Sequence, residues 1–230
     1  MMDYVEKFWY DGFCVIPNVI SENERHEYIS LVKNVIQNDI LVKDYKGNNN
    51  RLYNLSQTES QFSSLYNNSK LIDIAKTILD IESIDVWRDR LFPCETVLHP
   101  PLRMNNTLKC SPNKSLTCYL CLIDSKCVRI SKGSHKKTER EFTFPHNHKN
   151  SIEGEGTILD LTLRGKNLEP QDIEFSEMCA IFFHNNTIVE GSNPIGMSGT
   201  FYPVVAWEYI DTNQKNVYTK DNIEHGRITL

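Results

Sequence analysis

The sequence has no basic excess, no long apolar run and no recognisable leader. Its 230 residues carry a formal net charge of −5, which argues against a basic nucleic-acid-binding face. Its longest purely apolar runs, such as 180–183, are far shorter than the roughly 20 residues that span a bilayer. Charged residues at positions 3, 6 and 7 replace the apolar core of a signal peptide. We therefore predict a cytoplasmic protein, in a reducing compartment, with no nucleic-acid partner and no membrane span.

Two common catalytic motifs are also missing. Gly191-Ser192 lacks the Gly-x-Ser-x-Gly frame that exposes a nucleophilic serine. The segment 191–196 lacks the Lys-Ser or Lys-Thr pair that completes a phosphate-binding loop. An unrelated hydrolase is therefore only the third hypothesis for the function.

The cysteines do not form a disulfide framework, because their number, seven, is odd and no secretion signal accompanies them. Cys118 and Cys121 have the spacing of a zinc-binding pair. On a strand, however, residues three apart point to opposite faces, so these two thiols cannot share one metal ion. We expect reduced thiols in and near strands.

No repeat or linker divides the chain, so we predict one domain over residues 1–230. An asparagine-rich stretch at 48–50 is typical of AT-rich genomes, including viral and protozoan ones. The N-terminal part predicts a short amphipathic helix, a strand and two longer helices. Ser21 with Glu24 forms a capping box for the first long helix, and Ser69 is the expected cap of the second. The expected ranges are 4–10, 13–17, a helix after Ser21, and 70–79.

After residue 80 the pattern changes to short extended segments separated by turn residues. We expect strands at 83–88, 95–99, 116–123, 128–131, 158–163, 178–184 and 200–209. Two helices followed by seven or eight strands predict a mainly β fold with flanking helices, in which two antiparallel sheets form a jelly roll.

Three local patterns coincide with one protein family. They are Asp-Gly-Phe-Cys-Val-Ile-Pro at 11–17, Ile-Ser-Lys-Gly-Ser-His at 130–135, and Phe-Phe-His at 182–184 followed by Glu-Gly-Ser-Asn at 190–193. In order and spacing the chain resembles the phytanoyl-CoA dioxygenase family of Fe(II)/2-oxoglutarate-dependent oxygenases, over roughly residues 4–211. The resemblance implies a double-stranded β-helix, the same jelly roll that the strand pattern predicts.

The resemblance also implies a metal site, and the sequence departs from it. The family holds iron with a His-x-Asp pair and a distal His, which leave open positions for 2-oxoglutarate. Here the corresponding positions are Arg103, Asn105 and Glu190. Gly199 and Thr200 stand where a basic residue would bind 2-oxoglutarate, and no Lys or Arg occurs from 167 to 214.

These departures indicate a catalytically degenerate member without iron or 2-oxoglutarate. An arginine is a permanent cation with no lone pair for a metal. We predict no catalytic residue and a binding or structural role, with an unknown protein partner, self-association or a small ligand in the barrel. If Arg103 and Glu190 mark two former ligand positions, they would share one small volume and form a salt bridge, with Asn105 at its edge.

The alternative is an active Fe(II)/2-oxoglutarate-dependent oxygenase with a non-standard metal site. Its ligands would be a set such as His99, Glu190 and His184. His146 and His148 have a spacing suited to one face of a strand, although a polar loop favours solvated side chains there. His135 matches a structural turn of the family, and we expect its ring to bond to the backbone.

Overall fold

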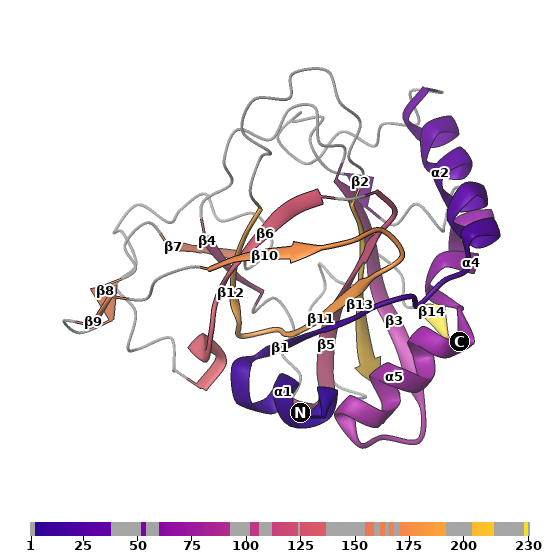
Figure 1. The fold of residues 1–230 in the computed structure, drawn as a ribbon. Helices are drawn as coiled ribbons and strands as arrows, with labels where there is room; N and C mark the ends of the chain where they lie inside the picture. Colours follow the sequence, from indigo (N-terminus) through magenta and orange to yellow (C-terminus); the bar gives the residue numbers. More distant parts are fainter. Residues whose placement is uncertain are drawn as a thin grey trace.

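The structure is a computed structural model that describes residues 3–37, 52–53, 60–92, 102–105, 112–123, 125–136, 155–158, 162–163, 166–167, 171–191, 204–213 and 228–229. Helices flank one side of a two-sheet body (Figure 1). The helical elements are α1 (Tyr4–Asp11), α2 (Glu22–Gln37), α4 (Ser63–Tyr66), α5 (Ser69–Leu79) and the single 3-10 turns η1 (Ser60–Phe62), η3 (Pro112–Lys114) and η4 (Ser134–Lys136).

The helix ends are capped largely as the sequence predicts. Glu24 accepts hydrogen bonds from the Ser21 backbone N–H and hydroxyl, each at 2.7 Å, which completes the capping box of α2. The predicted cap of α5 is wrong by one residue. Asn68, not Ser69, is the N-cap, and its side chain accepts from the N–H groups of Lys70 and Leu71. Asn68 also donates to Glu24 at 3.0 Å, so this residue joins the starts of α2 and α5.

The strands form a larger sheet of seven strands, in the order β1-β11-β5-β13-β3-β14 with β2 beside β3, and a smaller one of five, β10-β6-β12-β4-β7. Their pairings are antiparallel. From β3 to β13 the chain passes back and forth between the two sheets, which is the jelly roll, or double-stranded β-helix, that the sequence predicts.

The strand bounds are β1 Phe13–Ile16, β2 Leu52–Tyr53, β3 Ile84–Phe92, β4 Leu102–Asn105, β5 Ser115–Cys121, β6 Ser125–Ser131, β7 Glu155–Ile158, β8 Thr162–Leu163, β9 Lys166–Asn167, β10 Gln171–Phe175, β11 Ala180–His184, β12 Ile188–Gly191, β13 Val204–Asp211 and β14 Ile228–Thr229. β8 and β9 pair with each other as a separate hairpin. The strand expected at 95–99 lies outside the described residues. The other expected strands overlap described ones, with ends that differ by a few residues.

Two apolar clusters occupy the two faces of the larger sheet. The first lies between this sheet and the helices, and includes Phe8 of α1, Ile78 of α5 and Trp207 of β13. The second is smaller and joins the two sheets, because Phe183 of β11 packs there with residues of β6 and β12. We call the face toward the helices the helix-side face and the face toward the smaller sheet the inner face.

The two cysteines of β5 lie on opposite faces of the larger sheet. Cys118 lies in the helix-side cluster and Cys121 in the inner cluster, as expected for residues three apart on a strand. Both are free thiols, and burial raises the pKa of Cys118 well above its ordinary value, which disfavours the reactive thiolate.

Among the described residues no helix is both long and apolar enough to cross a bilayer.

Candidate functional site

The three positions that the family resemblance singles out lie on two adjacent strands of the smaller sheet. Arg103 and Asn105 are on β4, and Glu190 is on β12. The side chains of all three lie outside the described part of the structure, but their backbone register is defined. Val189, not Glu190, is opposite Arg103, and Ile188 is opposite Met104.

This register separates positions 103 and 190. Directly paired residues share a face, and successive residues of a strand alternate between faces. Arg103 therefore shares its face with Val189, whereas Glu190 belongs to the opposite face of the sheet. The expectation that Arg103 and Glu190 meet in one small volume is wrong on this register.

Val189 identifies which face is the inner one. Its side chain is 8% exposed and belongs to the inner cluster, together with Ile130, its partner on β6. Positions 103 and 105 are two residues apart on β4 and so lie on this same inner face. The inner positions of β12 are those of Val189 and Gly191, and neither residue type offers a ligand atom in its side chain.

The donor set at these positions does not fit an iron(II) ion. A facial triad needs neutral nitrogen and anionic oxygen donors directed at one point. The residue types at positions 103, 105 and 189 are instead an arginine, an asparagine and a valine. In the part of the chain that the structure describes, no group of three or more His, Cys, Asp or Glu side chains is arranged to hold a metal ion.

The inner face of the larger sheet carries a buried polar cluster that the sequence analysis missed. Thr117 of β5 is opposite Phe183 on one side and Glu208 on the other, which places all three on the inner face. Ser115 lies two residues earlier and is opposite Ile210, which in turn is opposite Asp85. We call this set the inner polar cluster, and its members, each at most 2% exposed, are Asp85, Ser115, Thr117, Asn185 and Glu208.

Hydrogen bonds connect part of this cluster. The Thr117 hydroxyl donates to Asn185 Oδ1 at 2.8 Å, and Asn185 Nδ2 donates to Ser115 Oγ at 2.8 Å. The cluster thus combines hydroxyl, amide and carboxylate groups in a buried environment, where such groups interact strongly and specifically. Alternating polar residues in a strand are more typical of a solvent-exposed face, so the sequence alone gives no signal for a buried cluster.

His184, a proposed ligand of the alternative metal site, lies on the opposite face. Its ring packs near Phe8 and Trp9 of α1, with centroids 6.2 and 6.0 Å away. Its Nδ1 accepts a hydrogen bond from the Asn186 backbone N–H at 3.1 Å, so its Nε2 carries the proton and donates to Asn113 Oδ1 at 3.3 Å. Both nitrogens are therefore engaged, and no lone pair is left for a metal.

The other histidines of the sequence analysis are placed as follows. His135 Nε2 lies 3.0 Å from the carbonyl oxygen of Trp9, which confirms the expected bond to the backbone. His99, His146 and His148 lie outside the described residues, as do Gly199 and Thr200. The set His99, Glu190 and His184 therefore stays a prediction, since His184 is its one member with a described side chain.

Burial dominates the electrostatics of the two described histidines at this site. Loss of hydration, with a smaller contribution from the neighbouring His135, lowers the pKa of His184 from 6.5 to about 4. Burial also lowers the pKa of His135, with a smaller contribution from Lys136. Both imidazoles are therefore neutral at pH 7.

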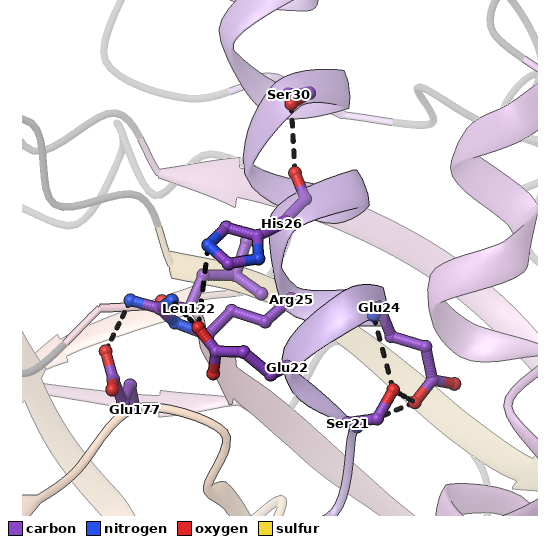
Figure 2. A network of polar contacts seen from close by, with 8 residues as sticks. All are labelled: Ser21, Glu22, Glu24, Arg25, His26, Ser30, Leu122 and Glu177. Atoms are coloured by element: carbon purple, nitrogen blue, oxygen red, sulfur yellow. Dashed lines mark hydrogen bonds and ion pairs between the residues drawn. The ribbon is translucent and has the colours of Figure 1, made fainter.

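A second polar network joins α2 to the end of the sheets (Figure 2). Arg25 donates from Nε to the Leu122 carbonyl at 2.9 Å and from one terminal nitrogen to Glu22 at 2.7 Å, and its other terminal nitrogen pairs with Glu177. The Arg25 side chain is 15% exposed. This network fixes α2 against the turn after β5 and the loop before β11, which is a structural role.

Solved structures resemble the chain throughout its length. The alpha-ketoglutarate-dependent epimerase SnoN from nogalamycin biosynthesis, in complex with Fe3+, alpha ketoglutarate and nogalamycin RO, has a TM-score of 0.71 and 12% identity and covers 90% of this chain and 82% of its own. AviO1 from Streptomyces viridochromogenes Tue57 has a TM-score of 0.68 and 13% identity, and the match covers 94% of this chain and 96% of AviO1.

HygX from Streptomyces hygroscopicus, with nickel and 2-oxoglutarate bound, has a TM-score of 0.64 and 13% identity. The match covers 96% of this chain and 93% of HygX. No family model and no curated protein matches the sequence. At these identities the likeness establishes the fold, which this chain shares with the non-heme, alpha-ketoglutarate-dependent epimerase SnoN and carbocyclase SnoK.

Proposed function

We propose that this chain is a pseudoenzyme: a single jelly-roll domain of the 2-oxoglutarate oxygenase superfamily that acts as a binding or structural component. In this proposal Arg103 and Asn105 are remnants of the His-x-Asp positions of the phytanoyl-CoA dioxygenase family. The domain has no resident iron or 2-oxoglutarate, and its own residues catalyse no oxygenation. Its partner is another protein, a second copy of the chain or a small ligand in the barrel, inside a reducing cytoplasm.

The pairing of Arg103 with Val189 is the observation that carries this proposal. With this register, positions 103 and 189 of the inner face carry an arginine and a valine, two residue types that do not ligate iron(II), where the fold would need metal ligands. The absence of Lys and Arg from 167 to 214 gives independent support, because β10 to β13 then offer no cation for the two carboxylates of 2-oxoglutarate.

Metal and cosubstrate binding to the purified chain test the proposal directly. We expect no heat of binding in anaerobic calorimetry with Mn²⁺ and 2-oxoglutarate, and no conversion of 2-oxoglutarate to succinate with Fe²⁺ under oxygen. Micromolar affinity for both Mn²⁺ and 2-oxoglutarate, or sustained succinate formation, would overturn it.

A pair of triple variants tests the register behind the proposal. Arg103→His, Asn105→Asp and Val189→His introduce three ligands on one face, and we expect Co²⁺ binding with visible absorption bands. The matched variant keeps the first two changes but carries Glu190→His, and we expect much weaker Co²⁺ binding. Equal Co²⁺ affinities, or tighter binding by the Glu190→His variant, would contradict the register argument, provided that both proteins melt cooperatively.

An active oxygenase with a non-standard metal site is the second candidate. The bound metal and 2-oxoglutarate named for the similar structures favour it. The engaged nitrogens of His184 count against the specific ligand set His99, Glu190 and His184. If the succinate assay gives turnover, His184→Asn distinguishes the cases, because loss of turnover with retained folding would return His184 to the ligand set.

A measurement of the molar mass in solution distinguishes self-association from the other kinds of partner. Light scattering coupled to size-exclusion chromatography separates self-association from a monomer. A monomer would direct the search to a heterologous protein or to a small ligand, and a dimer would support self-association.

A further inference from the structure

Three segments that are distant in sequence meet at the end of α1. Gly12 caps the helix in the left-handed region, with φ +89°. Its carbonyl accepts from the His184 backbone N–H at 2.9 Å and from the Thr187 hydroxyl at 2.8 Å. One residue earlier, the Asp11 carbonyl accepts from the Gly133 N–H at 2.7 Å. The corner between α1 and β1 is thus attached to both β11 and the turn after β6.

Two histidine rings lie within this corner, with centroids 5.2 Å apart. His135 holds the turn to α1 through its Nε2, which donates to the Trp9 carbonyl. Its Nδ1 is buried and has no hydrogen-bond partner among the described residues. A Cβ on Gly12 would come within 2.5 Å of this nitrogen, so ring and backbone are in close contact there.

Protonation of either ring places a new buried donor where the described residues offer no acceptor, although the bond from His135 Nε2 to the Trp9 carbonyl is compatible with both charge states. A proton on His135 Nδ1 would be a buried donor facing the Gly12 backbone without an acceptor. A proton on His184 Nδ1 would face the Asn186 N–H that now donates to it. Two imidazolium ions would also repel each other across a buried contact.

We propose that His135 and His184 form an acid-sensitive latch, in which protonation of either imidazole releases the α1–β1 corner from β11 and from the 131–136 turn while the two sheets stay folded. This inference does not depend on the presence or absence of a metal. The low pKa of His184, about 4, agrees with the geometry and sets the range in which the latch opens.

The charged groups around the latch oppose its protonation on balance. Lys136 adjoins His135 and stacks on the Tyr10 ring at 4.4 Å, and it favours the neutral imidazole. Asp11 favours the charged form, but it is ion-paired to Lys132 at 3.0 Å and to Lys7 at 3.7 Å. On the η3 side the ring of His184 meets an uncharged amide, Asn113.

Hydrogen exchange measured by NMR at pH 7 and pH 4.5 tests the latch. The reporter amides are those of Gly133 and His184, which bond across the corner, and the reference amide is Cys121, which bonds to Cys179 at the other end of β5. For a group whose pKa is 6.5 in the open state and about 4 in the closed state, the protection factor should fall roughly 60-fold between pH 7 and pH 4.5. The Cys121 protection factor should change far less.

Variants separate the latch from a general effect of acid. His135→Gln keeps a side-chain N–H that can donate to the Trp9 carbonyl, and His184→Asn keeps an oxygen that can accept from the Asn186 N–H. Together the two changes remove both titrating imidazoles and preserve one hydrogen bond of each. This double variant should lose the pH dependence at Gly133. The control His26→Gln alters an imidazole that is 68% exposed on α2, and should leave the dependence unchanged.

Two results would overturn the latch. One is equal loss of protection at Gly133, His184 and Cys121, which would mean global unfolding. The other is an undiminished fall at Gly133 in the double variant. If that variant does not fold, ring C–H titration of the wild-type protein decides, because a His184 midpoint equal to that of His26 is incompatible with the latch.

Discussion

The two faces of the larger sheet are buried by different means. On the helix-side face, β5, β11 and β13 contribute an almost continuous apolar layer beneath α1, α4 and α5. On the inner face, β5 and β11 contribute to a smaller apolar cluster, and next to it lie five buried polar residues from β3, β5, β13 and the turn after β11. The helix-side layer stabilises the fold mainly by apolar burial, with His184 and Asp89 as buried polar residues on that face. The inner face keeps groups that a folding core does not require, and it is therefore where we expect a ligand or its remnant.

The largest expected effect that tests this comparison comes from two neighbouring phenylalanines on β11. Phe182 lies in the helix-side cluster at 0% exposure, and Phe183 lies in the inner cluster at 2%. We expect Phe182→Ala to lower the free energy of unfolding by about 3–5 kcal/mol, in the range for buried aromatic truncations. Phe183→Ala should cost less, because its surroundings are smaller and partly polar. Urea unfolding of both variants measures the difference, and equal losses would break the comparison.

Acid should destabilise the helix-side face through His184. Its pKa is 6.5 when unfolded and about 4 when folded, so the unfolded state binds the extra proton between these values. The contribution of His184 is thus complete above pH 6.5, falls as the pH drops and approaches a loss of about 3 kcal/mol near pH 4. Urea unfolding across this range checks it, and His184→Asn should flatten the curve. A profile that His184→Asn leaves unchanged would show that other groups cause the loss.

A smaller effect is expected in the inner polar cluster. Thr117→Val keeps the shape of the side chain but leaves Asn185 Oδ1 without its donor, so we expect a loss of about 1–3 kcal/mol in unfolding free energy. The matched control is Thr77→Val on α5, where an exposed hydroxyl donates to the Asp73 carbonyl, and the change should be within about 0.5 kcal/mol. A neutral Thr117→Val variant would mean that the cluster tolerates loss of this bond.

The smallest test concerns the helical layer. Asn68→Ala removes the N-cap of α5 and its bond to Glu24, and we expect a loss of about 1 kcal/mol in thermal or urea unfolding. Ser69→Ala, at the neighbouring helical position, should be nearly neutral. The reverse order would restore Ser69 as the cap that the sequence pattern favours.

The sequence predicts the elements better than it predicts the site. The spacing of apolar residues and the capping motifs identify α1, α2 and most strands, because both patterns depend on residues that are close in the sequence. The position of the α5 cap was wrong by one residue, because Asn68 and Ser69 are both good caps and only the contact with Glu24 separates them. The pairing of Val189 with Arg103 and the inner polar cluster depend on register between distant strands, which no local pattern encodes.

The register of β12 also has an evolutionary consequence. A strand exchanges its two faces when a single codon is gained or lost in the turn before it. The turn between β11 and β12, residues 185–187, is such a place. One insertion or deletion there moves position 190 from one face to the other while the letters Glu-Gly-Ser-Asn stay the same. In this fold a ligand can therefore leave a metal site, or arrive at one, in a single genetic step that a motif comparison does not detect.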